Sequence, residues 1–399
     1  MNTISINRIA FTVCNLGYLN KALVLANSLN QTNQLRTNIF IFDNEIDLPT
    51  FEDHIIITWI KDVAGDDFLK HAFKYNVIEL TTAYKPFIAN KLIEVYDQVL
   101  FFDPDIMFFG DLETVYKELN SNCFLLTPHL CNVQSEASEN IHLQRFGFYN
   151  LGFFAFDNSN YSKSILDWWW KQCIDYCYDE SSRGMFTDQK WMSLAPFYFP
   201  KISVIKDYGL NVAWWNLKER EINFKDDQFF INGSPLIFFH FSSFVSQNKL
   251  TKRPFNPGTN KLAILLQLAL QYENNLNKIH LNINKTYSFD YFIDGDYINQ
   301  LLRTAYSANI DLFSKIENPF SKPREIKIYI KKNNLKSRGV ANYSHIGYQD
   351  KNKHIKIIWL YAFILRIVLF VIGPNRYIAF NRLMNYSNSL MNFKEFWRK

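Results

Sequence analysis

The chain has few cysteines, and their arrangement argues against two common kinds of structural site. Five are present among 399 residues, an odd number without the paired C-x-x-C spacing of structural zinc sites. Cys173 and Cys177 lie four residues apart, about one helical turn, with no histidine nearby. A disulfide framework is also not expected from this pattern, which indicates a reducing, cytoplasmic environment.

Other signals are missing as well. The segment MNTISINRIAFTVCN has no basic stretch followed by an apolar one, so we expect no signal peptide. The loop after the first expected strand, TVCNLGYLN, contains only Gly17 instead of the glycine-rich phosphate loop of a nucleotidyltransferase. No nucleic-acid recognition motif accompanies the basic residues, so nucleic acid is not an expected partner.

Aromatic side chains are abundant, with 37 Phe, 22 Tyr and 9 Trp. Such richness occurs in sugar-binding clefts, although core packing is the commoner reason. Trp214 and Trp215, in NVAWWNLKER, lie near expected loops and are candidates for an acceptor cleft. The hydrophobic fraction of 48% and the charged fraction of 20% are typical of a globular protein with a full core.

Apolar runs alternate with helical patterns through the first 250 residues. Strands are expected at RIAFTVCN, NIFIFDN, HIIITWI and QVLFF, and helices at GYLNKALVLANSLNQTN and TTAYKPFIANKLIEVYD. The strand runs are continuously apolar, as in strands that are covered on both faces. This alternation predicts an α/β fold with a mostly parallel sheet flanked by helices.

The run VLFFDPDIMFFG places Asp103 and Asp105 in one of the most apolar stretches of the chain. A buried carboxylate is costly unless it is paired or bound to a metal. The strand QVLFF ends at Asp103, and ligands of open α/β sheets bind at the carboxyl ends of strands. Pro104 stiffens the turn, so the two carboxylates form an oxygen site suited to Mg²⁺ or Mn²⁺. The alternative is an ordinary surface turn, the interpretation favoured for the second D-x-D at Asp294.

Five motifs occur in a recognisable order: the D-x-D after an apolar strand, FYNLGFFAFDNS, TDQKWM, NVAWWNL and FFHFSSF. Over residues 7–250 the chain resembles the GT-A-fold, nucleotide-sugar-dependent glycosyltransferases, in particular the family 8 galactosyltransferase and glycogenin-like group. It is also similar to bacterial surface-polysaccharide transferases. The resemblance implies a Rossmann-like GT-A catalytic domain over residues 1–250. The residues that follow indicate a helical extension over 251–320 and a basic, apolar, membrane-associating segment over 321–399.

The same resemblance implies a function. It is the transfer of a sugar from a UDP-sugar to a hydroxyl of a surface-polysaccharide or lipid-linked glycan acceptor, with retention of anomeric configuration. Inversion stays open, because the usual Gly-x-x-Lys-Pro-Trp ending after the last histidine is absent. The alternatives are a catalytically inactive glycan-binding or scaffold protein of the same fold, and a sugar-nucleotide nucleotidyltransferase.

Residue roles follow from the resemblance too. Asp103, Asp105 and His240 would hold Mn²⁺ or Mg²⁺, which stabilises the departing nucleoside diphosphate. The residues expected to bind the donor are Thr12, Asn15, Tyr18, Lys85, Asn150, Gly152 and Lys252. The residues expected at the reacting centre are Asp188 and Gln189, with Asp157 as a further candidate general base in an inverting enzyme.

Each assignment has a structural alternative. His240 lies between two phenylalanines and could be a core histidine, Lys85 could be a solvated helix charge, and Asn150 could cap a turn. Asp188 could be the N-cap of a helix, with Thr187 as the competing cap. The residues that could supply the missing phosphate-binding lysine are Lys249, Lys252 and Arg253.

The charge is unevenly distributed. Residues 321–399 hold 16 Lys and Arg against 3 Asp and Glu, whereas residues 1–320 hold 27 against 35. Within the basic part, the apolar run Ile355 to Gly373 has Arg366 at its centre. A membrane span needs about 20 apolar residues and a central arginine makes spanning costly, so we expect an interfacial helix on an anionic membrane. The expected location is cytoplasmic, at the inner face of the membrane; the alternative is a helix docked on the catalytic domain.

Overall fold

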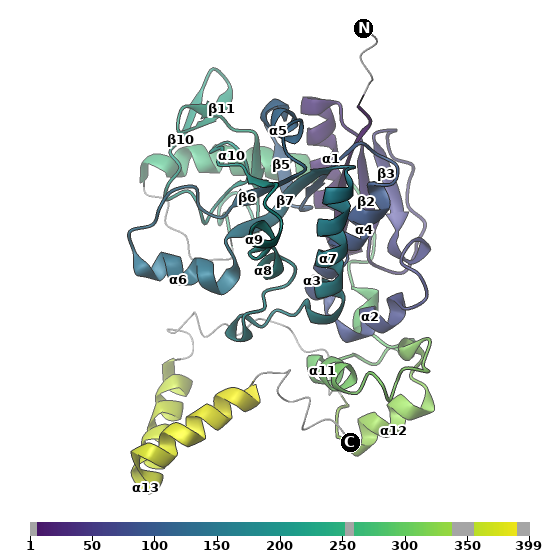
Figure 1. Cartoon of the computed structure of the whole chain (residues 1–399), viewed down its shortest axis with the longest axis vertical. Helices are drawn as coiled ribbons and strands as arrows, with labels where there is room; N and C mark the ends of the chain where they lie inside the picture. The colour runs from purple at the N-terminus through teal and green to yellow at the C-terminus, as the bar shows by residue number, and fades with distance from the viewer. Residues whose placement is uncertain (1–5, 252–258, 337–354, 389–399) are drawn as a thin grey trace. The chain divides into compact units, whose positions relative to one another are not determined.

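The computed structural model describes residues 6–251, 259–336 and 355–388. These residues belong to two compact units, and Figure 1 shows the course of the chain through both. The first unit comprises Met1–His71 with Val77–Phe289, and the second comprises Ala72–Asn76 with Asp290–Lys399. The domain limits expected from the sequence, at residues 250 and 320, stay a prediction.

A seven-stranded sheet forms the centre of the first unit. Its strands, in order across the sheet, are β3 (Ile55–Trp59), β2 (Thr37–Ile41), β1 (Arg8–Cys14), β4 (Gln98–Phe102), β7 (Tyr149–Asp157), β6 (Phe124–Pro128) and β8 (Ile202–Val204). Neighbouring strands are parallel, except that β7 runs antiparallel to both β4 and β6. The expected α/β class with a mostly parallel mixed sheet is therefore confirmed.

Most helices of the first unit lie between these strands in the chain, and α10 follows the last strand. They are α1 (Leu19–Asn33), α2 (Phe68–Lys74, whose last residues belong to the second unit), α3 (Val77–Ala83), α4 (Lys85–Leu92), α5 (Glu113–Leu119), α6 (Ala137–Phe146), α7 (Asn160–Tyr176), α8 (Gln189–Met192), α9 (Ala195–Tyr198) and α10 (Thr259–Asn277). The single helix expected around Pro86 is in fact two, α3 and α4. Pro86 lies in the first turn of α4, where its missing N–H leaves no hydrogen bond unmade.

Helices cover both faces of the sheet. Successive residues of a strand point to opposite faces, so each strand contributes side chains to the packing on both sides. On one face, Leu100 of β4 packs in a cluster with side chains of α1 and α5. On the other, Phe154 of β7 contacts Trp169 of α7, with ring centroids 5.1 Å apart. Burial on both sides explains why the strands read as uninterrupted apolar runs.

The strand order reverses beside β1, since β2 and β3 lie on one side of it and β4 on the other. In open α/β sheets such a reversal opens a crevice outside the carboxyl ends of the strands. Asn15 follows β1 and Asp103 follows β4 at this edge. The topology thus marks the place where a ligand would bind.

Two small sheets complete the first unit. One contains β5 (Ile106–Phe108), β13 (Phe238–His240) and β9 (Val212–Ala213), and the other contains β10 (Ile222–Lys225), β11 (Gln228–Ile231) and β12 (Ser234–Pro235). β13 is antiparallel to β5, with His240 opposite Ile106. This pairing brings His240 beside the strand end that carries the two aspartates.

The second unit contains the helices α11 (Gln300–Ala308), α12 (Arg324–Lys332) and α13 (Ile355–Asn388). Segment 72–76 is held in this unit by the buried Arg303, which donates hydrogen bonds to the carbonyl oxygens of Ala72, Phe73 and Tyr75. The same guanidinium pairs with Asp290 at 3.0 Å. A basic, helical C-terminal part is therefore present, as expected.

Helix α13 is long and apolar enough to cross a membrane by length and composition. It is broken at Gly373, whose φ of 76° and ψ of 165° are not helical, and Pro374 follows. Pro cannot continue a helix without losing a backbone hydrogen bond, so the two arms meet at a kink. Its apolar residues are exposed, including Trp359 and Phe370.

Candidate active site

The two aspartates lie on the connection between β4 and β5. The amide of Ile106 donates to the carbonyl oxygen of Asp103 over 3.2 Å, which closes a four-residue turn with Pro104 at its second position. Neighbouring backbone fixes both ends of the turn. The amide of Asp103 donates to the Gly152 carbonyl, and the Asp105 carbonyl accepts from the Phe241 amide, each at 2.8 Å.

His240 completes a three-residue cluster with these aspartates. Its Nε2 atom lies 3.1 Å from Oδ1 of Asp105 and 3.7 Å from Oδ2 of Asp103. Potential ligand atoms of the three side chains all lie within 4.8 Å of one another. Burial by itself raises the pKa of the Asp105 carboxyl, but His240 and then Lys21 outweigh it and hold that pKa below its usual value.

These residues fit a divalent cation. Two carboxylates and one imidazole form a donor set suited to Mn²⁺ or Mg²⁺. His240 presents Nε2 to both aspartates, while its Nδ1 is buried without a hydrogen-bond partner among the described residues. A proton on Nδ1 would leave Nε2 with a free lone pair, the state that a metal ligand requires.

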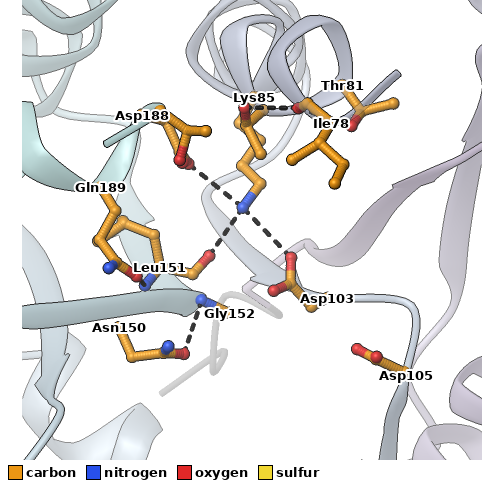
Figure 2. Close-up of polar contacts among 12 residues, drawn as sticks. Ile78, Thr81, Lys85, Asp103, Asp105, Asn150, Leu151, Gly152, Asp188 and Gln189 are labelled. Carbon is orange, nitrogen blue, oxygen red and sulfur yellow. Dashed lines mark hydrogen bonds and ion pairs between the residues drawn. The ribbon is translucent and has the colours of Figure 1, made fainter. Parts of the chain in front are cut away.

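Lys85 links the cluster to a third carboxylate, as Figure 2 shows. Its Nζ atom lies 3.2 Å from Asp103, 3.2 Å from Asp188 and 3.0 Å from the carbonyl oxygen of Leu151. The side chain is buried, so the alternative of a solvated helix charge is excluded. Burial lowers the pKa of Lys85, but the two carboxylates outweigh this effect and raise it above the usual value, so Lys85 is a cation.

Asp188 is buried at the end of a strained segment. Thr187 has a φ of 47°, a left-handed conformation that is rare for a β-branched residue. Its hydroxyl donates to Oδ1 of Asp188, while Oδ2 faces Lys85. Asp188 occupies the N-cap position of α8 without a side-chain capping bond, so its carboxylate serves the Lys85 cluster instead. Burial raises the pKa of Asp188, with the charge of Lys85 opposing this rise.

Gly152, on β7, lies directly against the ring of His240. A Cβ atom at Gly152 would lie 2.7 Å from Cε1 of His240, closer than real Cβ contacts. The backbone amide of Gly152 donates to Oδ1 of Asn150 at 3.0 Å. The same oxygen accepts a hydrogen bond from the side-chain Nδ2 of Asn211, also at 3.0 Å. Figure 2 shows the first of these bonds.

Gln189 braces the same strand. Its Oε1 accepts from the Leu151 amide at 3.3 Å, and its Nε2 donates to the carbonyl oxygen of Phe146 at 2.9 Å. Leu151 is therefore held from both sides, by Gln189 through its amide and by Lys85 through its carbonyl. These contacts suit a residue that positions β7.

The residues after β1 lie at the same edge. Asn15 is partly buried, directly after the strand. Tyr18 is 42% exposed, and Lys21 lies over its ring, 4.1 Å from the centroid. The same lysine lies 3.9 Å from Asp105 and so links Tyr18 to the cluster. Desolvation of the phenol and then the charges of Asp105 and Asp103 raise the pKa of Tyr18 to about 12.

Two expected site residues are corrected by the structure. Thr12 lies inside β1 rather than at its end and is fully buried. Asp157 pairs with Gln98 at the opposite end of β4 from Asp103. Its carboxylate accepts hydrogen bonds from Ser159 and Ser162 at the start of α7, so it anchors that helix and does not reach the reacting centre. Lys252 lies outside the described residues.

The two adjacent tryptophans lie in different environments. Trp214 is buried against Phe239, with centroids 4.8 Å apart, and belongs to the core. Trp215 is partly buried beside His240, with centroids 5.2 Å apart. Of the two tryptophans, only Trp215 therefore contacts a residue of the cluster.

Sequence reasoning missed Asp43, although the run NIFIFDN has the same strand-end pattern as QVLFFD. Asp43 follows β2 and is 1% exposed. It accepts hydrogen bonds from the amides of Leu16, at 3.0 Å, and Ser288, at 2.8 Å. It therefore fixes the loop that carries Asn15 and Tyr18.

No family model matches the chain. Two curated proteins of Bacillus subtilis (strain 168), both uncharacterized, are similar to parts of it. YfnD is 27% identical over 210 residues, which are 51% of this chain and 65% of YfnD. YfnF is 31% identical over 159 residues, which are 39% of this chain and 52% of YfnF. The chain thus spans less than two thirds of the length of either relative.

Among solved structures, the galactosyltransferase LgtC, in complex with donor and acceptor sugar analogues, matches with a TM-score of 0.43 and 14% identity over 70% of this chain and 98% of LgtC. The apo form of the glycosyltransferase GlyE of Streptococcus pneumoniae TIGR4 matches with a TM-score of 0.39 and 15% identity over 68% of this chain and 62% of GlyE. Both of these solved structures are glycosyltransferases.

Proposed function

We propose that this protein is a metal-dependent glycosyltransferase that moves a sugar from a UDP-sugar to a hydroxyl of a surface-polysaccharide or lipid-linked glycan. The observation that carries the proposal is the Asp103, Asp105 and His240 cluster, built at the carboxyl end of β4 where the strand order reverses. A nucleotidyltransferase is disfavoured, because the turn after β1 holds one glycine instead of a glycine-rich phosphate loop.

The cluster would hold Mn²⁺ or Mg²⁺. When bound, the cation neutralises the diphosphate of the donor and favours its departure. Asn15 and Tyr18, at the end of β1, would contact the nucleotide. Asp43 keeps their loop in place through the Leu16 amide.

The chain's own residues then prepare the reacting centre. In the transfer, the bond from the anomeric carbon to the diphosphate breaks, a bond to the acceptor oxygen forms, and the acceptor loses its proton. Lys85 fixes Asp188 close to Asp103 and offsets the repulsion between the two carboxylates. In a retaining reaction Asp188 would stabilise positive charge at the anomeric carbon. In an inverting reaction its raised pKa would make it a better base for the acceptor proton.

We further propose that the protein works at the cytoplasmic face of a membrane. The exposed apolar side chains of α13 and the excess of basic residues after 320 support this placement. An acceptor glycan attached to a lipid would be presented at the same surface.

The first test is calorimetric binding of UDP to the full chain, with Mn²⁺ and with EDTA. We expect binding that requires Mn²⁺ and is lost in Asp105→Asn. Asp294→Asn is the matched control, because Asp294 belongs to a D-x-D turn where both carboxylates pair with Lys322 instead of a histidine. Binding that is equal with Mn²⁺ and EDTA, or absent from wild type, would refute the proposed metal–diphosphate site. Hydrolysis of a panel of UDP-sugars then identifies the sugar.

A further inference from the structure

The second unit contains a cavity of about 400 Å³ that the proposed transferase reaction does not use. This volume falls within the range of small-molecule sites, roughly 300–1,000 Å³. Its apolar lining comprises Phe292, Tyr297, Leu302, Ile330 and Leu335. All five side chains are buried. This apolar floor of the cavity therefore belongs to the packed interior of the second unit.

Four lysines line the same cavity: Lys322, Lys327, Lys331 and Lys336. The single acidic residue among the lining residues is Asp296, which together with Asp294 pairs with Lys322. In the described part of the chain, Lys327, Lys331 and Lys336 form no salt bridge. The lining therefore carries a net positive charge.

The two lysines of α12 that line the cavity lie on one face of the helix. Lys327 and Lys331 are four residues apart, one helical turn, and both line the cavity. Like charges at this spacing destabilise a helix. The buried Ile326, Tyr329 and Ile330 fix the helix so that it cannot rotate these lysines away. A bound anion would offset the repulsion and accept hydrogen bonds from both ammonium groups.

We propose that this cavity binds the phosphate headgroup of an anionic lipid, with the lysines on the phosphate and the apolar floor against the adjoining hydrocarbon. The joining of an apolar floor to a basic rim is what such an amphiphile requires. Inorganic phosphate would leave the apolar floor without a partner, and an uncharged glycan would leave the lysines without one.

The position of the cavity in the chain supports a lipid source. Its last lining residue, Lys336, is joined to α13 through residues 337–354. A membrane-bound α13 would therefore confine the cavity to the neighbourhood of the bilayer and raise the local lipid concentration. The inference rests on the proposed membrane association for its source of ligand, and it is independent of the proposed sugar transfer.

The test is calorimetric titration of the full chain with dihexanoyl phosphatidic acid, below the concentration at which it forms micelles, and with inorganic phosphate. We expect the short-chain lipid to bind and inorganic phosphate to bind about tenfold more weakly or worse, because phosphate lacks the hydrocarbon. The variant Lys327→Gln/Lys331→Gln should lose lipid affinity by about tenfold or more. Lys332→Gln is the matched control, since Lys332 is exposed on the same helix but does not line the cavity.

Three outcomes would overturn the inference: no lipid binding by wild type, equal losses in the double variant and the Lys332→Gln control, or equal binding of inorganic phosphate and lipid. The third outcome would identify a simple phosphate site. Unfolding midpoints confirm that the variants fold, and the Mn²⁺-dependent UDP titration in the same preparations separates this inference from the proposed function. Loss of lipid binding with intact UDP binding would be specific to the cavity.

Discussion

The imidazole of His240 occupies the space that any side chain at Gly152 would need. A Cβ atom at position 152 would lie 2.7 Å from Cε1 and 2.8 Å from Nδ1 of His240. The glycine thus allows the close approach of a strand and a ring that are 88 positions apart in the sequence. This relationship links the YNLGFF and FFHFSS motifs physically.

Gly152→Ala should therefore displace His240 and weaken Mn²⁺-dependent UDP binding by about tenfold or more, since a metal ligand must be held close to its productive position. The measurement is the UDP titration with Mn²⁺. If Gly152 acts through His240, adding Gly152→Ala to His240→Ala should cause little further loss. Fully additive losses would show that Gly152 acts independently.

Lys85→Met should destabilise the fold by roughly 3–5 kcal/mol, because it leaves two carboxylates without their buried counter-charge. Urea unfolding measures this loss. Lys85→Met/Asp188→Asn should be less destabilised than the sum of its single variants, since the second change removes one of the unpaired charges. Additive losses would mean that Lys85 and Asp188 are not energetically coupled.

We expect stability to depend on pH through His129, which directly follows β6 and whose Nδ1 donates to the carbonyl oxygen of Gly147 at 3.0 Å. Burial lowers its pKa from 6.5 to about 4, so the folded state takes up this proton less readily than the unfolded state. The contribution of neutral His129 to the free energy of unfolding is fully present above pH 6.5, and it is lost as the pH falls from 6.5 to about 4. Between pH 7 and pH 5 the loss is about 2 kcal/mol.

Urea unfolding of wild type and His129→Gln at both pH values isolates this contribution. The variant should lose about 2 kcal/mol less than wild type over the same interval, because it lacks the imidazole that resists protonation in the folded state. Equal pH dependence in the two proteins would show that His129 is protonated as easily in the folded state as in the unfolded state.

Phe370→Glu should reduce binding of the full chain to vesicles that contain anionic lipid, because Phe370 is 91% exposed on the apolar α13 and burial of a phenyl ring in lipid is favourable. Co-sedimentation with vesicles measures the change. Ile293→Glu is a control on an exposed apolar residue outside α13. Unchanged binding in Phe370→Glu would argue against insertion of this helix.

The sequence alone determined the fold class and the two aspartates of the cluster, and the resemblance in the motifs added His240, Lys85 and Asp188 as expected site residues. Continuous apolar runs separated by helical patterns predict buried parallel strands, and the rule that ligands bind after such strands identifies Asp103 and Asp105. These are local signals, because the polar residues directly follow the run that forms the strand. The same rule would have identified Asp43.

Only the tertiary structure decided how distant residues approach them and which expected residues stay away. The strand run that ends at Asp157 looks like the others, but β7 runs antiparallel to β4, so its first residues rather than its last approach Asp103. Strand direction depends on hydrogen-bond partners across the sheet, which an apolar pattern does not encode. In the same way, the pairing of β13 with β5 brings His240 to Asp105, and the burial of Lys85 decides between a solvated helix charge and a cation that pairs with two carboxylates.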